Sequence, residues 1–439
     1  MSEKLSSLKK EILEKTREYQ RQRKLEERGF DKSMPRVPVS GKVFDGDDVS
    51  SLVDASLEFW LTAGKFADKF EAKLSATMGL KHALMVNSGS SANLVALSAL
   101  MCSSLGSARI RRNDEVITSA TSFPTTVNPI IQNGLVPVFI DIELENCNPD
   151  ISSVEGAITE RTKAVMLAHT LGNPFDAVRL ERICNKHNLY LIEDCCDALG
   201  ATINGKSVGT FGDFATLSFY PAHHITTGEG GAVLTDDDAL KRAAESMRDW
   251  GRDCWCKPGC DNTCGKRFGW SFPNLPEGYD HKYIYSNIGY NLKGTDMQAA
   301  VGITQLDKLP EFVQARRNNF GFYFSFFKKF EKFFIMPNVI DGANASPFGY
   351  LVNIKEGAPF ARKEIVTFLE KNGIATRMLF GGNIARQPAY ADSNYRAFGN
   401  LKNADHAMRN AFWIGVYPGI THEMLEYVAE TLERFLAKY

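Results

Sequence analysis

Residues 218–231 read Ser-Phe-Tyr-Pro-Ala-His-His-Ile-Thr-Thr-Gly-Glu-Gly-Gly, and they join two apolar runs, Phe214–Phe219 and Ala232–Thr235. Both runs have the length and composition of buried β-strands, and the glycine-rich segment between them is typical of a turn. Two adjacent histidines, His223 and His224, precede that turn. A lone histidine is more often structural, but a histidine can also move a proton near neutral pH. The rest of the chain decides between these two interpretations.

Short apolar runs alternate with segments of helical spacing from about residue 70 onward. This alternation favours an α/β fold in which a mostly parallel sheet is covered by helices on both faces. Ligands of such sheets bind beyond the carboxyl ends of the strands, so the motifs that end these runs are expected to converge. The seven predicted strands are His82–Val86, Glu115–Ser119, Val136–Ile142, Ala164–Ala168, Leu189–Ile192, Phe214–Phe219 and Ala232–Thr235.

The sequence predicts three regions. Residues 1–44 begin with a segment dense in Lys, Glu and Arg, which we interpret as a charged helical arm. Residues 45–309 form the large domain, which ends with a predicted helix over Asp296–Leu309 and includes an irregular loop over 254–285. Residues 310–439 form a smaller α+β domain, with a long aromatic helix predicted over Phe320–Phe334.

The composition is that of an ordinary globular protein. The 439 residues are 44% apolar and 23% charged, with a formal net charge of −1. This balance gives no reason to expect a nucleic acid or a membrane surface as partner, and no apolar run approaches the roughly 20 residues that span a bilayer. The arm does not resemble a secretory signal, so a cytoplasmic location with reduced thiols is expected.

A candidate phosphate cradle lies in the segment Asn87-Ser-Gly-Ser-Ser-Ala-Asn93, which contains Ser90 and Ser91. The segment follows a predicted strand and opens a predicted helix. Glycine lets the backbone approach an anion, and a helix N-terminus offers free N–H groups. The plainer alternative is a strand–helix turn with good capping residues.

Two carboxylates, Glu193 and Asp194, end a very apolar strand. Buried acids are costly unless they are paired. An aspartate that faces a pyridine nitrogen keeps that nitrogen protonated and makes the ring an electron sink. The alternative is a pair of acids that simply face water at the end of a strand.

Nine cysteines are present, and four of them, Cys254, Cys256, Cys260 and Cys264, fall within eleven residues. Such clustering indicates a metal site, and ligation by cysteine alone suits zinc or an iron–sulfur cluster. Cys195 and Cys196 follow Asp194 directly, so a metal bound by either would lie close to the candidate pyridine site. The spacing does not decide which of these cysteines are ligands.

The ordered set of motifs resembles the DegT/DnrJ/EryC1 family of nucleotide-sugar enzymes, which have the type I aminotransferase fold. The set consists of Ser-Gly-Ser-Ser, Thr121-Ser-Phe123, Glu193-Asp194, the 218–231 segment, Gly289-Tyr-Asn291 and Asp296-Met-Gln-Ala-Ala300. The resemblance implies a pyridoxal phosphate cofactor. It also implies that Ser90, Ser91 and Ser218 bind the phosphate, Phe123 stacks on the ring, Asp194 pairs with the pyridine nitrogen and Asn291 reaches the phosphate of a neighbouring subunit in a homodimer.

One position departs from the aminotransferases of this family, because His223 stands where they carry the lysine that forms a Schiff base with the cofactor. Histidine cannot form that bond but can still transfer protons. Asp197 likewise stands where aminotransferases usually carry Gln or His. The chain is therefore similar to one subgroup of the family, the CDP-4-dehydro-6-deoxyglucose 3-dehydrases. In that subgroup four cysteines hold a 2Fe–2S cluster, which implies Cys196, Cys254, Cys256 and Cys264 as ligands here.

The subgroup resemblance also implies a reaction. Pyridoxamine phosphate, bound without a covalent link, condenses with a CDP-4-dehydro-6-deoxy sugar, and His223 acts as the general base. The C3 hydroxyl leaves as water, and electrons from an NAD(P)H-dependent flavin/iron–sulfur reductase pass through the cluster. The product is a precursor of the 3,6-dideoxyhexoses of lipopolysaccharide.

Three alternatives remain at this stage. A cluster-free 3-dehydratase acting on a GDP-4-dehydro-6-deoxy sugar would share the histidine but leave the cysteines unexplained. An ordinary nucleotide-sugar aminotransferase would require the missing lysine. A non-catalytic member of the family would use the cysteines for structural zinc.

Overall fold

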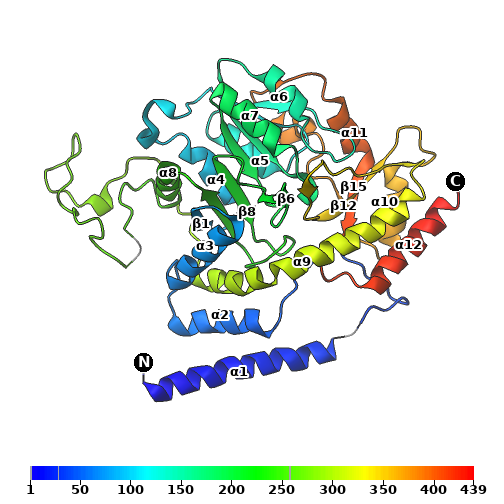
Figure 1. Cartoon of the computed structure of the whole chain (residues 1–439), viewed down its shortest axis with the longest axis horizontal. Helices are drawn as coiled ribbons and strands as arrows, with labels where there is room; N and C mark the ends of the chain where they lie inside the picture. Colours follow the sequence, from blue (N-terminus) through cyan, green and yellow to red (C-terminus); the bar gives the residue numbers. More distant parts are fainter. Residues whose placement is uncertain (1, 28, 257–258) are drawn as a thin grey trace.

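The computed structural model describes residues 2–27, 29–256 and 259–439. An eight-stranded sheet forms the centre of the larger part of the molecule (Figure 1). β9 runs antiparallel to β1 and β8, and the other neighbouring pairs are parallel. The spatial order of the strands is β1 (His82–Val86), β9 (Gly231–Thr235), β8 (Phe214–Ser218), β5 (Tyr190–Asp194), β4 (Thr162–Ala168), β2 (Glu115–Ser119), β3 (Val136–Ile140) and β14 (Arg396–Ala397).

All seven predicted strands form, and the predicted number is one short. The additional strand, β14, is two residues long and comes from the C-terminal part of the chain. Arg396 anchors it, because Nη2 donates to Oε2 of the buried Glu115 at 2.8 Å. Because β14 has only two residues and one of them is charged, it contains no apolar run. The sequence pattern therefore could not reveal it.

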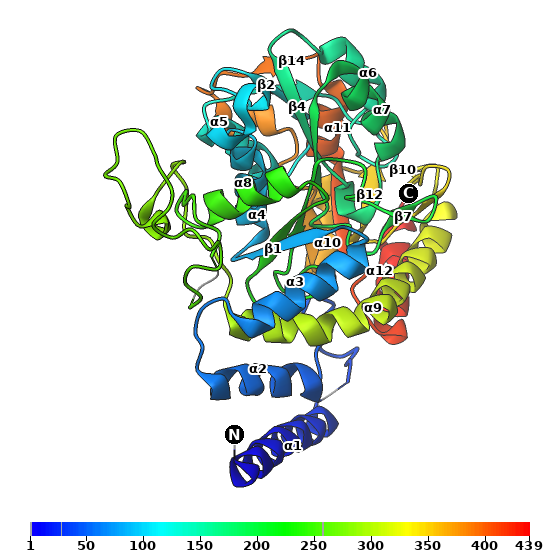
Figure 2. The ribbon, with the colours of Figure 1, turned by 60° about the vertical axis from the view of Figure 1, so that its left-hand side comes forward.

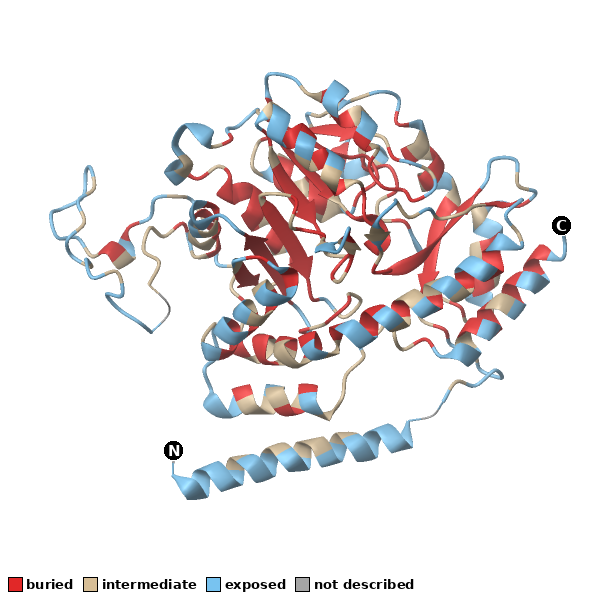
Figure 3. Cartoon of the chain, in the orientation of Figure 1, coloured by how far each residue is buried: buried red, intermediate tan, exposed pale blue. Residues whose placement is uncertain are grey.

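Helices cover both faces of this sheet, as the alternating pattern predicted. Figure 2 shows α4, α5 and α8 on one side of the strands and α6 and α7 on the other. Apolar residues of each set of helices are buried against the strands (Figure 3). The helices of the larger part are α2 (Gly46–Glu58), α3 (Lys65–Met78), α4 (Gly89–Ala99), α5 (Pro124–Gln132), α6 (Ile151–Ala157), α7 (Ala177–His187), α8 (Asp238–Arg248) and α9 (Asp296–Lys328).

α9 corrects the prediction of two separate helices over 296–309 and 320–334. It runs without interruption from Asp296 to Lys328, and the proposed domain boundary near residue 309 falls inside it. Pro310 lies on the exposed side, while Leu309 and Phe312 on either side of it are buried. The proline therefore removes one hydrogen bond facing solvent, and the buried face keeps the helix continuous.

The C-terminal part forms a smaller α+β unit, as expected. Its four-stranded antiparallel sheet has a core of its own, to which the second half of α9 contributes aromatic residues. The strands are, in spatial order, β10 (Phe334–Ile335), β12 (Gly349–Ile354), β15 (Ala411–Gly415) and β13 (Thr376–Met378), and the helices are α10 (Arg362–Lys371), α11 (Lys402–Asn410) and α12 (His422–Leu436). A three-stranded sheet pairs β11 (Ala343–Asn344) of the smaller part with β6 (Thr202–Ile203) of the larger part, and β7 (Lys206–Ser207) completes it.

The N-terminal arm contains α1 (Glu3–Glu26), which has no buried residue (Figure 3). Charged contacts hold it along α2: Lys9 pairs with Asp54 and Glu58, and Arg17 Nε donates to Asp47 Oδ1 at 2.7 Å. Exposed pairs of this kind contribute little stability. Within the part of the chain that the structure describes, no helix is long and apolar enough to cross a membrane.

Gly172 joins the two parts of the molecule. It has φ +79°, and a Cβ atom there would lie 1.8 Å from the Ser346 carbonyl oxygen and 2.6 Å from that of Asp197. We therefore expect Gly172→Ala to lower the free energy of unfolding by about 2–4 kcal/mol, since positive φ and overpacking each cost energy. Gly205→Ala is the matched control, because Gly205 has the same φ with nothing within 4 Å. Denaturant unfolding of both variants measures the difference, and equal stability would contradict the close contact.

Candidate active site

A cleft of about 450 Å³ opens at the carboxyl ends of β4, β5 and β8. The smaller unit closes it with Arg377, Phe380 and Trp413. The sequence-predicted residues that line it are Ser90, Phe123, Asp194, Cys196, Ser218 and His223. The expectation that motifs at the ends of the strands converge is therefore met, as the geometry of an open α/β sheet requires.

The N-terminus of α4 forms one end of the cleft. Gly89 is packed so tightly that a Cβ atom would lie 2.4 Å from Ser218 Cβ, and one on Gly231 would lie 2.4 Å from the Ser88 carbonyl oxygen. The approach of Gly89 brings Ser218 beside the N-terminus of α4, whose first turn contains Ser90, and this arrangement is suited to an anion. Ser91 does not line the cleft; its N–H donates to the N-cap Ser88 Oγ at 3.1 Å, and its hydroxyl also contacts that oxygen.

Asp194 is held at the floor of the cleft by three donors. Oδ2 accepts from Asn93 Nδ2 at 2.8 Å and from Thr126 Oγ1 at 2.7 Å, and Oδ1 accepts from the Cys196 N–H at 3.1 Å. The carboxylate is 5% exposed. Hydrogen bonds to the charged form compensate its burial, so the arrangement suits an ionised carboxylate facing a cationic ligand. Asn93 and Thr126 were assigned no such role from sequence, since only the folded chain shows what they contact.

Glu193 points away from the cleft into the core. Its oxygens accept from the N–H groups of Gly209, Phe211 and Gly212 at 2.8–2.9 Å, and Oε2 lies 3.1 Å from His169 Nε2. His169, Glu193 and Cys195 form a compact buried group of potential metal ligands among the described residues. Because backbone N–H groups already donate to both oxygens of the Glu193 carboxylate, we interpret the three residues as a structural group.

The two adjacent histidines have different surroundings. His223 lines the cleft, and its Nδ1 lies 3.3 Å from Asp197 Oδ1. Burial raises the pKa of the Asp197 carboxyl above its usual range, and the contact with His223 opposes that shift. His224 is buried outside the cleft with Nε2 2.9 Å from the Ser346 carbonyl oxygen, and burial moves its pKa well below the usual value. Of these two histidines, His223 is therefore the one placed to exchange a proton with a ligand in the cleft.

Phe123 is half exposed at the rim of the cleft, edge-on to Phe380 at 6.4 Å between ring centroids. Asn291 lies elsewhere: it bridges to Asp249 and its Oδ1 accepts from Lys293 Nζ at 2.9 Å. Lys293 Nζ also lies 3.5 Å from the centre of the Trp250 ring. Asn291 is thus absent from the described lining of its own cleft.

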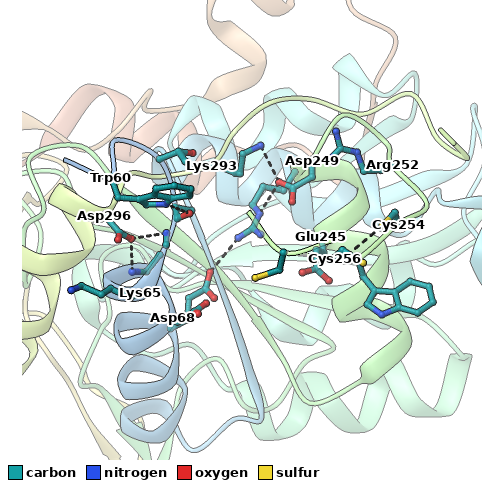
Figure 4. A pocket seen from close by; sticks show the side chains of 18 of the residues that line it. Trp60, Lys65, Asp68, Glu245, Asp249, Arg252, Cys254, Cys256, Lys293 and Asp296 are labelled. Atoms are coloured by element: carbon teal, nitrogen blue, oxygen red, sulfur yellow. Dashed lines mark hydrogen bonds and ion pairs between the residues drawn. The ribbon is translucent and has the colours of Figure 1, made fainter. Parts of the chain in front are cut away.

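A second pocket, of about 640 Å³, contains the first two cysteines of the irregular loop (Figure 4). Cys254 and Cys256 line it together with Cys260, whereas Cys196 lines the first cleft. Among the described residues, no three of the cysteines proposed as ligands have sulfur atoms within 4.8 Å of one another. The structure therefore does not present the four predicted ligands to one metal centre. Residues 257–258 of this loop lie outside the described residues.

Aromatic side chains organise the loop, which extends away from the body of the molecule (Figure 1, left). Trp255 and Trp270 pack around the buried His281, whose Nε2 lies 2.6 Å from Asp253 Oδ2. Burial opposes ionisation of Cys256, but hydrogen bonds from Thr263 and the backbone lower its pKa to about 7. A thiol of this kind is partly ionised at neutral pH and suited to binding a metal.

The fold and the cleft place the protein among the proteins with the PLP-dependent aminotransferase fold. The chain belongs to the DegT/DnrJ/EryC1/StrS aminotransferase family, which it matches over residues 45–433. The fold predicted from the motifs is thus confirmed.

Three relatives are informative. The lipopolysaccharide biosynthesis protein RfbH of Salmonella typhimurium is 53% identical over 91% of this chain and 91% of its own length. The dTDP-4-dehydro-2,6-dideoxy-D-glucose 3-dehydratase of Saccharopolyspora spinosa is 49% identical over 100% of this chain and 94% of its own. The solved structure of the E. coli GDP-4-keto-6-deoxy-D-mannose-3-dehydratase with bound hydrated PLP is 30% identical, with a TM-score of 0.81, and covers 90% of this chain and 99% of that one.

Proposed function

We propose that the protein is a nucleotide-sugar 3-dehydratase that uses pyridoxamine phosphate bound without a covalent link. The observation that carries the proposal is the lining of the cleft, which contains His223 and, among the described residues, no lysine. An aminotransferase of this fold needs a lysine amine to form its Schiff base. The 3-dehydratase relatives at 49% and 30% identity support the same conclusion.

The described residues fit the cofactor. Asp194 would hold the pyridine nitrogen, and Ser90, Ser218 and the N-terminus of α4 would hold the phosphate. Phe123 is placed to cover the ring. When bound, pyridoxamine phosphate supplies an amine for the ketone of the sugar and a ring that accepts negative charge.

His223 is the proposed general base and acid. Asp197 contacts Nδ1, which leaves Nε2 to take a proton from the cofactor C4′ carbon and to return one to the departing C3 hydroxyl. Asp197 orients the imidazole in the way that a carboxylate orients a catalytic histidine in other enzymes. The residues of this chain thus supply proton transfer, orientation and a partly enclosed site.

The finer assignment is CDP-4-dehydro-6-deoxy-D-glucose as substrate, in the formation of 3,6-dideoxyhexoses for lipopolysaccharide. The relatives named for dTDP and GDP sugars make a nucleotide panel the direct test. We expect wild-type protein with pyridoxamine phosphate, supplied with electrons by NADH and a flavin/iron–sulfur reductase, to convert a CDP-linked 4-keto-6-deoxy sugar into its 3-deoxy product. The C3 hydroxyl leaves as water and two electrons are taken up, and mass spectrometry detects the loss of one oxygen. Borohydride treatment with PLP should leave the protein mass unchanged, and covalent labelling of the wild type would contradict the proposal.

Cluster binding is a separate proposal, and it requires the 254–285 loop to approach Cys196. We expect anaerobic protein to contain about two irons and two sulfides per chain. Cys254→Ser and Cys196→Ser should lose the iron, while Cys196→Ser retains the cofactor. The matched control is Cys260→Ser, in which the iron should remain. Zinc, or no metal, in anaerobic wild-type protein would refute the 2Fe–2S assignment and with it the proposed reductase partner.

A homodimer and a cytoplasmic location complete the proposal. Asn291 is absent from the described lining of its own cleft, as expected if it serves the cofactor of a second copy. Loss of cofactor affinity in Asn291→Ala, together with a dimer in sedimentation, would support that assignment.

A further inference from the structure

Arg316 of α9 is a buried side chain that none of the preceding roles explains. It is 1% exposed, and among the described residues its guanidinium donates only to backbone carbonyls. Nη2 lies 3.0 Å from the His223 carbonyl oxygen and 3.5 Å from that of Ala222, and Nη1 lies 3.2 Å from that of Phe348 and 3.3 Å from that of Pro347. One side chain therefore connects the turn that carries His223 to a segment of the smaller unit.

No carboxylate compensates this charge at ion-pair distance among the described residues. Asp197 is the acid whose field raises the pKa of Arg316, but burial acts more strongly and lowers that pKa to about 10. Nε is buried without a hydrogen-bond partner. Burying a cation without an acid in contact is destabilising, so apolar packing would make a more stable link if the role of Arg316 were purely structural.

The same segment of the smaller unit also contacts the ring of His223. The Phe348 ring lies 5.1 Å from the His223 ring and 5.9 Å from the Arg316 guanidinium carbon. His223 is therefore held at its backbone by Arg316, at its ring by Phe348 and at Nδ1 by Asp197.

We propose that Arg316 is a positioning residue for His223: by clamping the His223 and Phe348 carbonyls together it sets where the imidazole stands beside Asp197. This inference rests on the proposed role of His223 as the proton-transfer group. The planar guanidinium suits the task, because it directs donors to two segments at once, which an ammonium group cannot do in the same geometry.

Arg317 provides a matched control on the same helix. Its Nε donates to the Ala345 carbonyl at 2.8 Å and Nη2 to that of Gly200 at 3.4 Å, so it also ties the smaller unit to the larger one. It has no contact with His223 among the described hydrogen bonds. Loss of a structural clamp alone should therefore affect Arg316 and Arg317 variants alike.

The experiment uses the full-length protein with bound cofactor and ring-labelled histidine. The His223 resonance is assigned by its disappearance in His223→Asn. We expect Arg316→Gln to shift that resonance and Arg317→Gln to leave it in place. In the dehydration assay Arg316→Gln should lower kcat about 10–100-fold, because a displaced base reacts slowly, with KM within about twofold of wild type.

Arg316→Lys covers the case in which Arg316→Gln does not fold, and it should also shift the His223 resonance. A folded variant of either kind with a wild-type His223 resonance would overturn the inference. Failure of the proposed function would look different: the wild type would dehydrate none of the sugars, yet the resonance would still report whether Arg316 positions His223.

Discussion

His223→Asn should abolish dehydration while the cofactor still binds. We expect kcat to fall by about 10²–10⁴-fold, the usual contribution of a positioned general acid–base group. Asparagine is smaller and has no ring, so the ring contact with Phe348 is lost, but it is polar and uncharged and should leave the rest of the cleft in place. Single-turnover dehydration with pyridoxamine phosphate measures the loss, and the absorbance of bound cofactor reports binding.

His224→Asn is the matched control for this experiment. His224 lies next in the chain but faces the Ser346 carbonyl outside the cleft. The His224→Asn variant should have a lower free energy of unfolding, and its kcat per folded molecule should stay close to that of the wild type. Full activity in His223→Asn would eliminate the proposed base, and equal losses in the two variants would attribute the effect to folding. His223→Lys should not simply restore wild-type turnover, because lysine opens a Schiff-base route towards transamination.

Asp194→Asn has the second largest expected effect. A neutral amide cannot keep the pyridine nitrogen protonated, so the ring loses much of its capacity to accept negative charge. We expect a loss of about 10²–10³-fold in kcat, as for removal of one preorganised electrostatic group. Dehydration kinetics measure this loss, and a changed absorption spectrum of bound cofactor should accompany it.

Asp213→Asn controls for the removal of a strand-associated carboxylate. Asp213 Oδ2 accepts from the N–H of Leu191, near the start of β5, the strand that Asp194 ends. That variant should lose stability without a change in the spectrum of bound cofactor. Wild-type kcat in Asp194→Asn would show that Asp194 does not serve the ring, and the site proposal would then fail at its central residue.

Features that depend only on neighbouring residues in the sequence were predicted best. All seven predicted strands formed, because a buried strand needs a short apolar run and such a run is visible without any partner. The family was recognisable for a similar reason: its motifs follow one another in a fixed order along the chain. The prediction missed the edge strand at Arg396 and divided α9 into two helices. Both features depend on contacts with distant residues.

The sequence by itself determined the α/β architecture, the family and the presence of histidine in place of lysine at residue 223. The family motifs already singled out Asp194 and His223 from their neighbours, and only the tertiary structure shows that Glu193 points into the core and that His224 lies outside the cleft. Tertiary structure also revealed Asp197 and Arg316 around His223, and it places Cys196 in the lining of the cleft and Cys254 in that of the second pocket. Apolar periodicity records which residues are buried, whereas the direction and partner of a polar side chain depend on segments that meet only when the chain folds.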